Sequence, residues 1–128
     1  MTLFKVEVVS KKPGSFVISI FGSLDSEHYL ELEEKAMAVI GPAAKIIMLD
    51  LAGLSYISSM GISTLLKIKK AVEQNQGKFM LVNPQPQVKK VFEIIKALPL
   101  ETIFRSVEEA DVYLSGIQQG EIDKSKSY

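Results

Sequence analysis

Two adjacent serines, Ser58 and Ser59, are the residues best placed for chemistry in this sequence. They lie between an apolar run, residues 45–51, and a stretch from Ile62 in which apolar residues recur at helical spacing. A serine at the start of a helix ordinarily caps free backbone N–H groups. A phosphate there would meet the same N–H groups and the positive end of the helix dipole, and would add about −1.5 to −2 charges. The position alone leaves a cap and a phosphorylation site as alternatives.

Other arrangements that could support catalysis are scarce. The one histidine, His28, falls in a predicted helix, and no Gly-x-Ser-x-Gly turn supplies a nucleophile for it. Asp50 follows an apolar run, but a phosphoreceiver site would also need an acidic pair after the first strand. There is no cysteine and no glycine-rich phosphate loop. We therefore expect no enzyme activity, no cofactor and no metal, and we rank a small-ligand carrier last.

Composition restricts the class of protein further. With 128 residues, 47% hydrophobic and 23% charged, the chain has the size and make-up of one globular domain. The formal net charge is zero, which argues against nucleic-acid binding because no basic excess is present to neutralise phosphates. Neither a secretory signal nor an apolar run long enough to cross a bilayer is found. We expect a cytoplasmic protein without membrane insertion.

The elements that would position the two serines follow from hydrophobic periodicity. Strand-like runs over residues 4–9 and 16–21, joined by a Pro-Gly turn, predict an antiparallel hairpin. Asp25 or Ser26 is a plausible N-cap for a helix that reaches about Ile40. The middle of residues 45–51 is continuously apolar, as in a central strand covered on both faces, and residues 52–57 are predicted to link this strand to the next helix.

The second half of the chain continues the alternation. The pattern predicts a helix from Ser58 to about Asn75, followed by a strand over residues 78–82. It then predicts a helix that opens at the prolines 84 and 86, a short edge strand at 103–104 and a last helix from Ser106 to Leu114. Residues 116–128 are mostly polar and form either a loose extension or a weak continuation of the last helix.

This order predicts an α/β fold. An N-terminal antiparallel hairpin is followed by parallel βαβ units, giving a mixed sheet covered by about four helices, mainly on one face. We expect one domain over residues 1–115 and a polar C-terminal extension over residues 116–128.

Three stretches of the sequence together resemble the STAS domain family (sulfate transporter and anti-sigma factor antagonist). Residues 22–25, Gly-Ser-Leu-Asp, resemble its Gly-x-Leu-Asp; residues 50–61 resemble its Asp-Leu-…-Asp-Ser-(Ser/Thr/Ala)-Gly motif; and residues 83–110 fit its C-terminal half. The resemblance covers roughly residues 4 to 114. It implies a STAS-like version of the mixed sheet.

The resemblance also implies a role. Small free-standing members of the family bind, when unphosphorylated, an anti-sigma factor that is also a serine kinase, and so free a sigma factor for transcription. The kinase phosphorylates the serine after the motif's Asp, which abolishes binding, and a phosphatase resets the cycle. By position the acceptor is Ser59, with Ser58 as the weaker alternative. The implied partners are an anti-sigma factor kinase and a phosphatase, with the protein a monomer or weak homodimer.

Two residues depart from the family pattern: Ser58 replaces the motif's Asp, and Met60 replaces a small residue. They raise the alternative of a STAS scaffold module in a signalling or transport-associated complex without strict kinase control. In either case we expect the partner-binding residues to surround the acceptor. The expected set is Asp25, Ser26, Ser58, Ser59, Met60 and Ile62.

Overall fold

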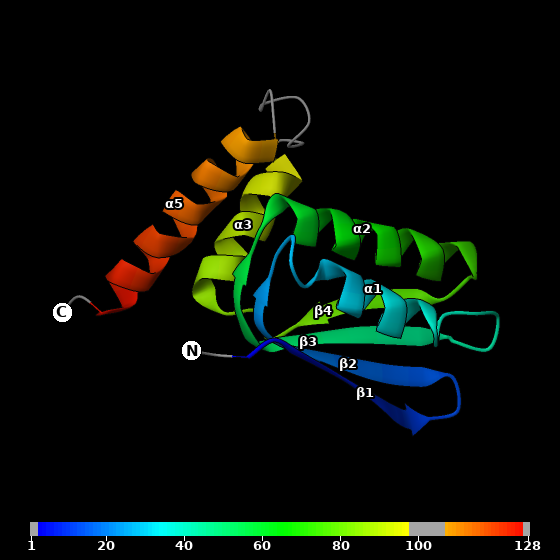
Figure 1. The fold of residues 1–128 in the computed structure, drawn as a ribbon. Helices are drawn as coiled ribbons and strands as arrows, with labels where there is room; N and C mark the ends of the chain where they lie inside the picture. Colours follow the sequence, from blue (N-terminus) through cyan, green and yellow to red (C-terminus); the bar gives the residue numbers. More distant parts are fainter. Residues whose placement is uncertain (1–2, 98–106, 127–128) are drawn as a thin grey trace.

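The computed structural model describes residues 3–97 and 107–126. Four strands and four helices occupy these residues, in the arrangement of Figure 1. In chain order they are β1 (Lys5–Lys12), β2 (Ser15–Leu24), α1 (Tyr29–Met37), β3 (Ile46–Ile57), α2 (Ser59–Gln74), β4 (Lys78–Val82), α3 (Pro86–Ala97) and α5 (Val107–Lys126).

The strands form one mixed sheet in the order β1-β2-β3-β4. β1 and β2 are antiparallel, whereas β2 with β3 and β3 with β4 are parallel. A two-residue turn is enough for the first pair, but each parallel pair needs a crossover, which α1 and α2 provide. The predicted hairpin followed by parallel units is therefore confirmed.

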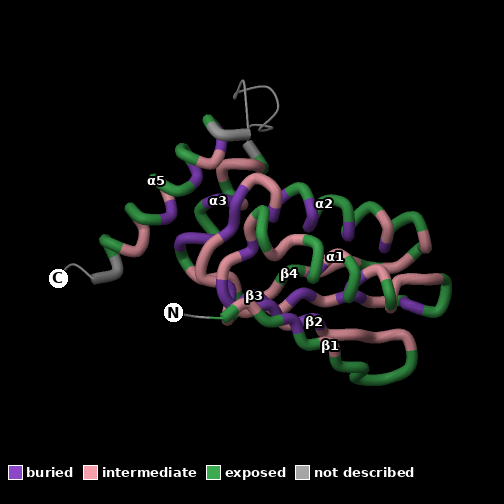
Figure 2. Tube along the Cα trace, viewed as in Figure 1, coloured by how far each residue is buried: buried purple, intermediate pink, exposed green. Residues whose placement is uncertain are grey.

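The helices α1 and α2 lie side by side over one face of the sheet (Figure 1). Side chains that point to this face are the buried ones, so β2 alternates between buried residues such as Ile18 and Ile20 and half-buried ones between them. Ile68 and Val72 of α2 pack onto the same core. The buried segments therefore lie where α2 faces the strands (Figure 2).

β3 is longer than its apolar run predicted. Residues 52–57, predicted as a link, continue the strand because they pair with the end of β2, where Phe21 is opposite Gly53 and Leu24 is opposite Ile57. Two irregularities in the register accompany this pairing. On its other side β3 pairs with β4 only through residues 46–50, so its second half has a free edge.

Glutamine side chains from the segment just before α3, from α3 itself and from α5 cover this free edge of β3. The Gln85 amide donates to the carbonyl of residue 52 (2.7 Å), and Gln87 donates to that of residue 55 (2.9 Å). Gln118 pairs with both backbone groups of Ile57, accepting from its N–H at 2.9 Å and donating to its carbonyl at 2.8 Å. Buried backbone groups need such partners, which explains why α3 and α5 pack together beyond the carboxyl end of β3.

The first helix differs from its predicted bounds at both ends. It begins at Tyr29, because the Asp25 carboxylate accepts from the N–H groups of Glu27 and His28 and closes a separate turn before the helix. It ends at Met37, three residues before the predicted Ile40.

The last helix, α5, continues to Lys126 and so includes most of the polar tail. Of the two alternatives for residues 116–126, the structure has the helical continuation, and the expected domain end at residue 115 falls within it. The predicted edge strand at 103–104 lies outside the described residues. Within residues 3–97 and 107–126, no helix has the length and apolar character needed to cross a membrane.

Candidate functional site

The two serines lie where β3 passes into α2, as the sequence predicted, but they have different roles. Ser58 is the N-cap residue in an extended conformation, and its hydroxyl accepts from the N–H of Gly61 at 3.2 Å. Its backbone N–H donates to the carbonyl of Leu24 at the end of β2 (2.9 Å). Ser58 is only 5% exposed, so its hydroxyl belongs to the structure of the helix start.

Gly61 lets the first turn of α2 approach the end of β2. A Cβ atom on residue 61 would lie 2.6 Å from the carbonyl oxygen of Leu24 and 2.8 Å from the Ile57 side chain. Real Cβ contacts are longer than this, so a larger residue would force the helix away from the strand. The glycine of the motif thus fixes the position of the two serines against β2.

Ser59 is the first residue of α2 and is half-buried. Its hydroxyl donates to Asp111 Oδ1 at 2.7 Å, and its backbone N–H donates to the same oxygen at 2.9 Å. Asp111 belongs to α5, so a carboxylate from the last helix sits at the N-terminus of α2, where the helix dipole favours negative charge. No motif or spacing in the sequence connects these two residues.

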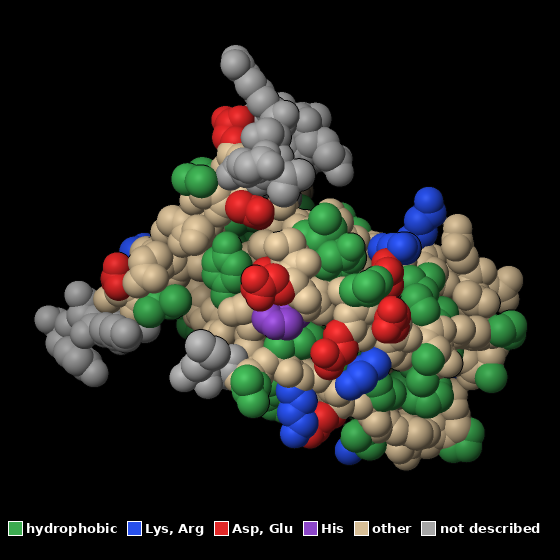
Figure 3. Space-filling view, viewed as in Figure 1, with side chains coloured by type: hydrophobic (Ala, Val, Ile, Leu, Met, Phe, Trp, Pro, Cys, Tyr) green, Lys and Arg blue, Asp and Glu red, His purple; other side chains and the backbone are tan. Residues whose placement is uncertain are grey.

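Asp25 and Ser26 lie next to this junction, in the turn between β2 and α1. The Asp25 carboxylate forms a contact of 2.9 Å with His28 Nδ1, and the His28 ring stacks on Phe4 with ring centroids 4.7 Å apart. Ser26 is exposed. In the described residues no hydrogen bond or ion pair is seen between the Asp25 side chain and Ser59; the carbonyl of the neighbouring Leu24 accepts from the Ser58 N–H. Figure 3 shows acidic side chains around the single histidine on this face.

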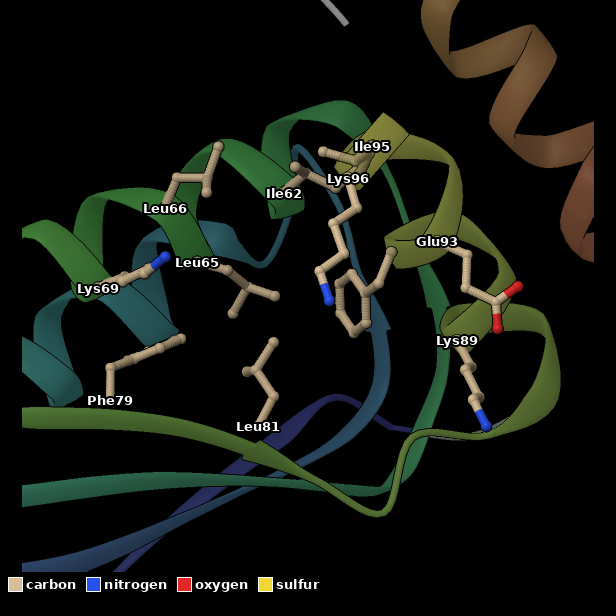
Figure 4. A pocket seen from close by; sticks show the side chains of 11 residues that line it. Ile62, Leu65, Leu66, Lys69, Phe79, Leu81, Lys89, Glu93, Ile95 and Lys96 are labelled. Atoms are coloured by element: carbon tan, nitrogen blue, oxygen red, sulfur yellow. The ribbon is translucent and has the colours of Figure 1, made fainter. Parts of the chain in front are cut away.

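The remaining two expected residues, Met60 and Ile62, differ in exposure because the turn of the helix points them in different directions. Met60 is half-buried, while Ile62 is 4% exposed and lines a groove of about 570 Å³ between α2, β4 and α3. The groove has an apolar floor and three lysines, Lys69, Lys89 and Lys96, around it (Figure 4). Ile62 therefore contributes to the core and to this groove.

The chemistry available at the junction is binding and modification. The Ser59 hydroxyl is in contact with a base there, because its hydrogen-bond partner is a carboxylate on a separate helix. Within the part of the chain that the structure describes, no cluster of three or more His, Cys, Asp or Glu side chains could hold a metal ion.

Sequence reasoning missed Asp111 and Gln118, the two α5 residues that contact this junction. A signal was present, because Ala110, Leu114 and Gln118 recur every four residues and all three are buried. Polar composition after residue 115 concealed that stripe.

Comparison with known proteins gives a consistent result. The family model described as the STAS domain matches residues 8–110. BtrV of Bordetella bronchiseptica, whose name assigns it provisionally to the anti-sigma factor antagonists, is 31% identical over 102 residues, which is 80% of this chain and 88% of BtrV. The anti-sigma F factor antagonist of Lysinibacillus sphaericus is 34% identical over 92 residues, covering 70% of this chain and 76% of that protein.

Solved structures of SpoIIAA also resemble this fold. SpoIIAA in its unphosphorylated form, described as an anti-sigma factor antagonist, has 30% sequence identity and a TM-score of 0.62, covering 76% of this chain and 84% of its own. Bacillus SpoIIAA in its phosphorylated form has 29% identity and a TM-score of 0.58, covering 72% and 82%.

Proposed function

The chain belongs to the STAS domain family, and from this premise we propose that it is an anti-sigma factor antagonist switched by phosphorylation of Ser59. Unphosphorylated, it binds an anti-sigma factor that is also a serine kinase and thereby regulates sigma-factor-dependent transcription. Phosphorylated, it no longer binds, and a phosphatase restores the first state. The proposal places the protein in the cytoplasm, where bacterial transcription takes place.

The observation that carries the proposal is the position of Ser59 as the first residue of α2. Its side chain is half-buried, so it combines a fixed position with access from outside. A phosphate attached there would lie at the N-terminal turn of α2, where the backbone N–H groups and the helix dipole favour anions. It would change the local charge by about −1.5 to −2 and so alter the outer surface without unfolding the domain.

The neighbouring hydroxyl is a poorer acceptor. Ser58 is buried, and its oxygen is occupied by the N–H of Gly61. Transfer of a phosphoryl group to Ser58 would require the helix to lose its cap. This contrast supports Ser59, rather than Ser58, as the modified residue.

The proposed binding surface surrounds Ser59. Ser26 is exposed, and Asp25 and Met60 are half-buried, so all three offer atoms to a partner, whereas Ser58 and Ile62 support them from below. Among the described residues of the turn before α1, Asp25 and Glu27 are acidic, which favours a partner with basic groups opposite them.

The test uses the candidate anti-sigma factor kinases encoded in the same genome. Each is mixed with the full chain and ATP, and the phosphate is mapped by mass spectrometry. Wild-type protein and Ser59→Ala should bind the partner, and phosphorylated wild type and Ser59→Asp should bind it at least tenfold more weakly, because an added charge that has no pairing group at an interface costs several kcal/mol. Ser59→Ala and Ser59→Asp both lack the acceptor hydroxyl and should resist phosphorylation, whereas wild type should be modified.

Ser63→Asp is the matched control, because Ser63 is exposed on the same helix one turn later. It adds the same charge and should leave binding unchanged. Phosphate found only at another residue, or equal binding by Ser59→Ala and Ser59→Asp, would refute the switch and favour a STAS scaffold module instead.

A further inference from the structure

Two side chains of α5 hold this helix against the junction between β3 and α2. Asp111 accepts both the hydroxyl and the backbone N–H of Ser59, and Gln118 pairs with the backbone of Ile57. Leu114, fully buried, lies between them on the same face of the helix. The candidate acceptor and the last strand residue before it are therefore both in contact with α5.

Asp111 occupies the place that a phosphate on Ser59 would take. Its Oδ1 atom lies 2.9 Å from the Ser59 N–H, at the end of α2 that attracts anions. A phosphate carried by Ser59 would seek the same donors and would bring its negative charge against the Asp111 carboxylate. Each anion would be covalently attached to its own helix, the phosphate to α2 and the carboxylate to α5, so their repulsion would act between the two helices.

We infer that α5 senses the charge on residue 59: it is docked through Asp111 while Ser59 is unmodified, and it is displaced when Ser59 carries a negative charge. The inference deepens the proposed function and rests on it for the source of that charge. Displacement would separate Gln118 from Ile57 and uncover the side of α3 against which α5 packs. Phosphorylation would then change a second surface, beyond the immediate surroundings of Ser59.

The test needs neither kinase nor partner. Hydrogen exchange of the full chain is measured for wild type, for Ser59→Asp, and for Ser59→Asn, which has the shape of aspartate without its charge. Ser59→Asp should accelerate exchange of the Ile57 amide and of the α5 amides by roughly tenfold or more relative to Ser59→Asn. Amides of β2, such as that of Ile18, should keep the same protection in both variants.

Asp111→Asn supplies the second half of the test. Removing the carboxylate should abolish the repulsion, so Ser59→Asp combined with Asp111→Asn should recover the protection of Asp111→Asn alone to within about threefold. If Asp111 were only a structural partner of Ser59, the two changes would add or worsen each other. A combined variant less protected than either single variant therefore overturns the inference.

Failure of this inference differs from failure of the proposed function. Equal exchange in Ser59→Asp and Ser59→Asn would show that α5 ignores the charge, even if partner binding still depends on it. Release of α5 without any change in partner binding would keep the charge-sensitive helix and remove the binding switch. Loss of protection in the β2 amides of Ser59→Asp would mean general unfolding and would also overturn the inference.

Discussion

Replacing Gln118 by methionine removes the hydrogen-bonding groups of a fully buried side chain and keeps its length. In the native fold Gln118 is 1% exposed, and its amide satisfies both the N–H and the carbonyl of Ile57 as well as the carbonyl of Leu114. Methionine fills much of the same space but offers neither donor nor acceptor of comparable strength. Two backbone groups at the end of β3 would be left without partners.

The expected cost follows from those two groups. Each buried backbone group deprived of its partner costs about 1–3 kcal/mol, so Gln118→Met should lower the free energy of unfolding by about 2–6 kcal/mol. The Leu114 carbonyl adds little, because it remains a helical carbonyl. A small domain has only about 5–15 kcal/mol in total, so the change should be large in a urea titration followed by circular dichroism.

Gln119→Met is the matched control, because Gln119 is the next residue of the same helix and bonds only the exposed Asp123. Its effect should remain within about 0.5 kcal/mol of wild type. A chain ending at residue 115 should lose at least as much stability as Gln118→Met, since it lacks Gln118 altogether. A loss below about 1 kcal/mol for Gln118→Met would refute the claim that α5 completes the edge of β3 and would return residues 116–126 to the status of a dispensable extension.

Further predictions concern the start of α2. Gly61→Ala should lower the free energy of unfolding by about 1–3 kcal/mol, because its Cβ would press on the Leu24 carbonyl. The control Gly116→Ala, at a helical position with open space, should raise the free energy of unfolding by about 0.5–1 kcal/mol. Equal effects in urea titrations would contradict the close approach of α2 to the end of β2. Ser58→Ala should cost about 1 kcal/mol through loss of the helix cap, and the exposed control Ser63→Ala should cost less than half of that; no difference between them would mean that Ser58 does not cap.

Much of this fold was predictable, because local patterns decide it. The alternation of Ile18 and Ile20 with half-buried neighbours marks β2, and the helical spacing of Leu65, Ile68 and Val72 marks α2. The second half of β3 was missed because Gly53 and Ser55 interrupt its apolar pattern. That segment is a strand through its pairing with β2, and a single-sequence pattern does not contain information about a partner strand.

The candidate site, like the fold, was predictable only in its local part. Its position at the start of α2 follows from local periodicity, whereas its contacts with α5 span more than fifty residues of sequence: Ser59 and Asp111 are 52 positions apart, and Ile57 and Gln118 are 61 apart. No property of residues 107–126 considered alone indicates that an aspartate and a glutamine seven residues apart will meet the same junction.

The two adjacent serines show what the tertiary contacts add. In sequence they are equivalent hydroxyls, and the departure from the family pattern lies at Ser58, where the pattern has an aspartate beside the acceptor. The structure brings a carboxylate to the candidate acceptor from another element, with Asp111 Oδ1 2.7 Å from the Ser59 hydroxyl. A carboxylate on the preceding residue would move with Ser59, whereas this one belongs to α5. Through Asp111 the environment of Ser59 therefore depends on where the last helix is docked.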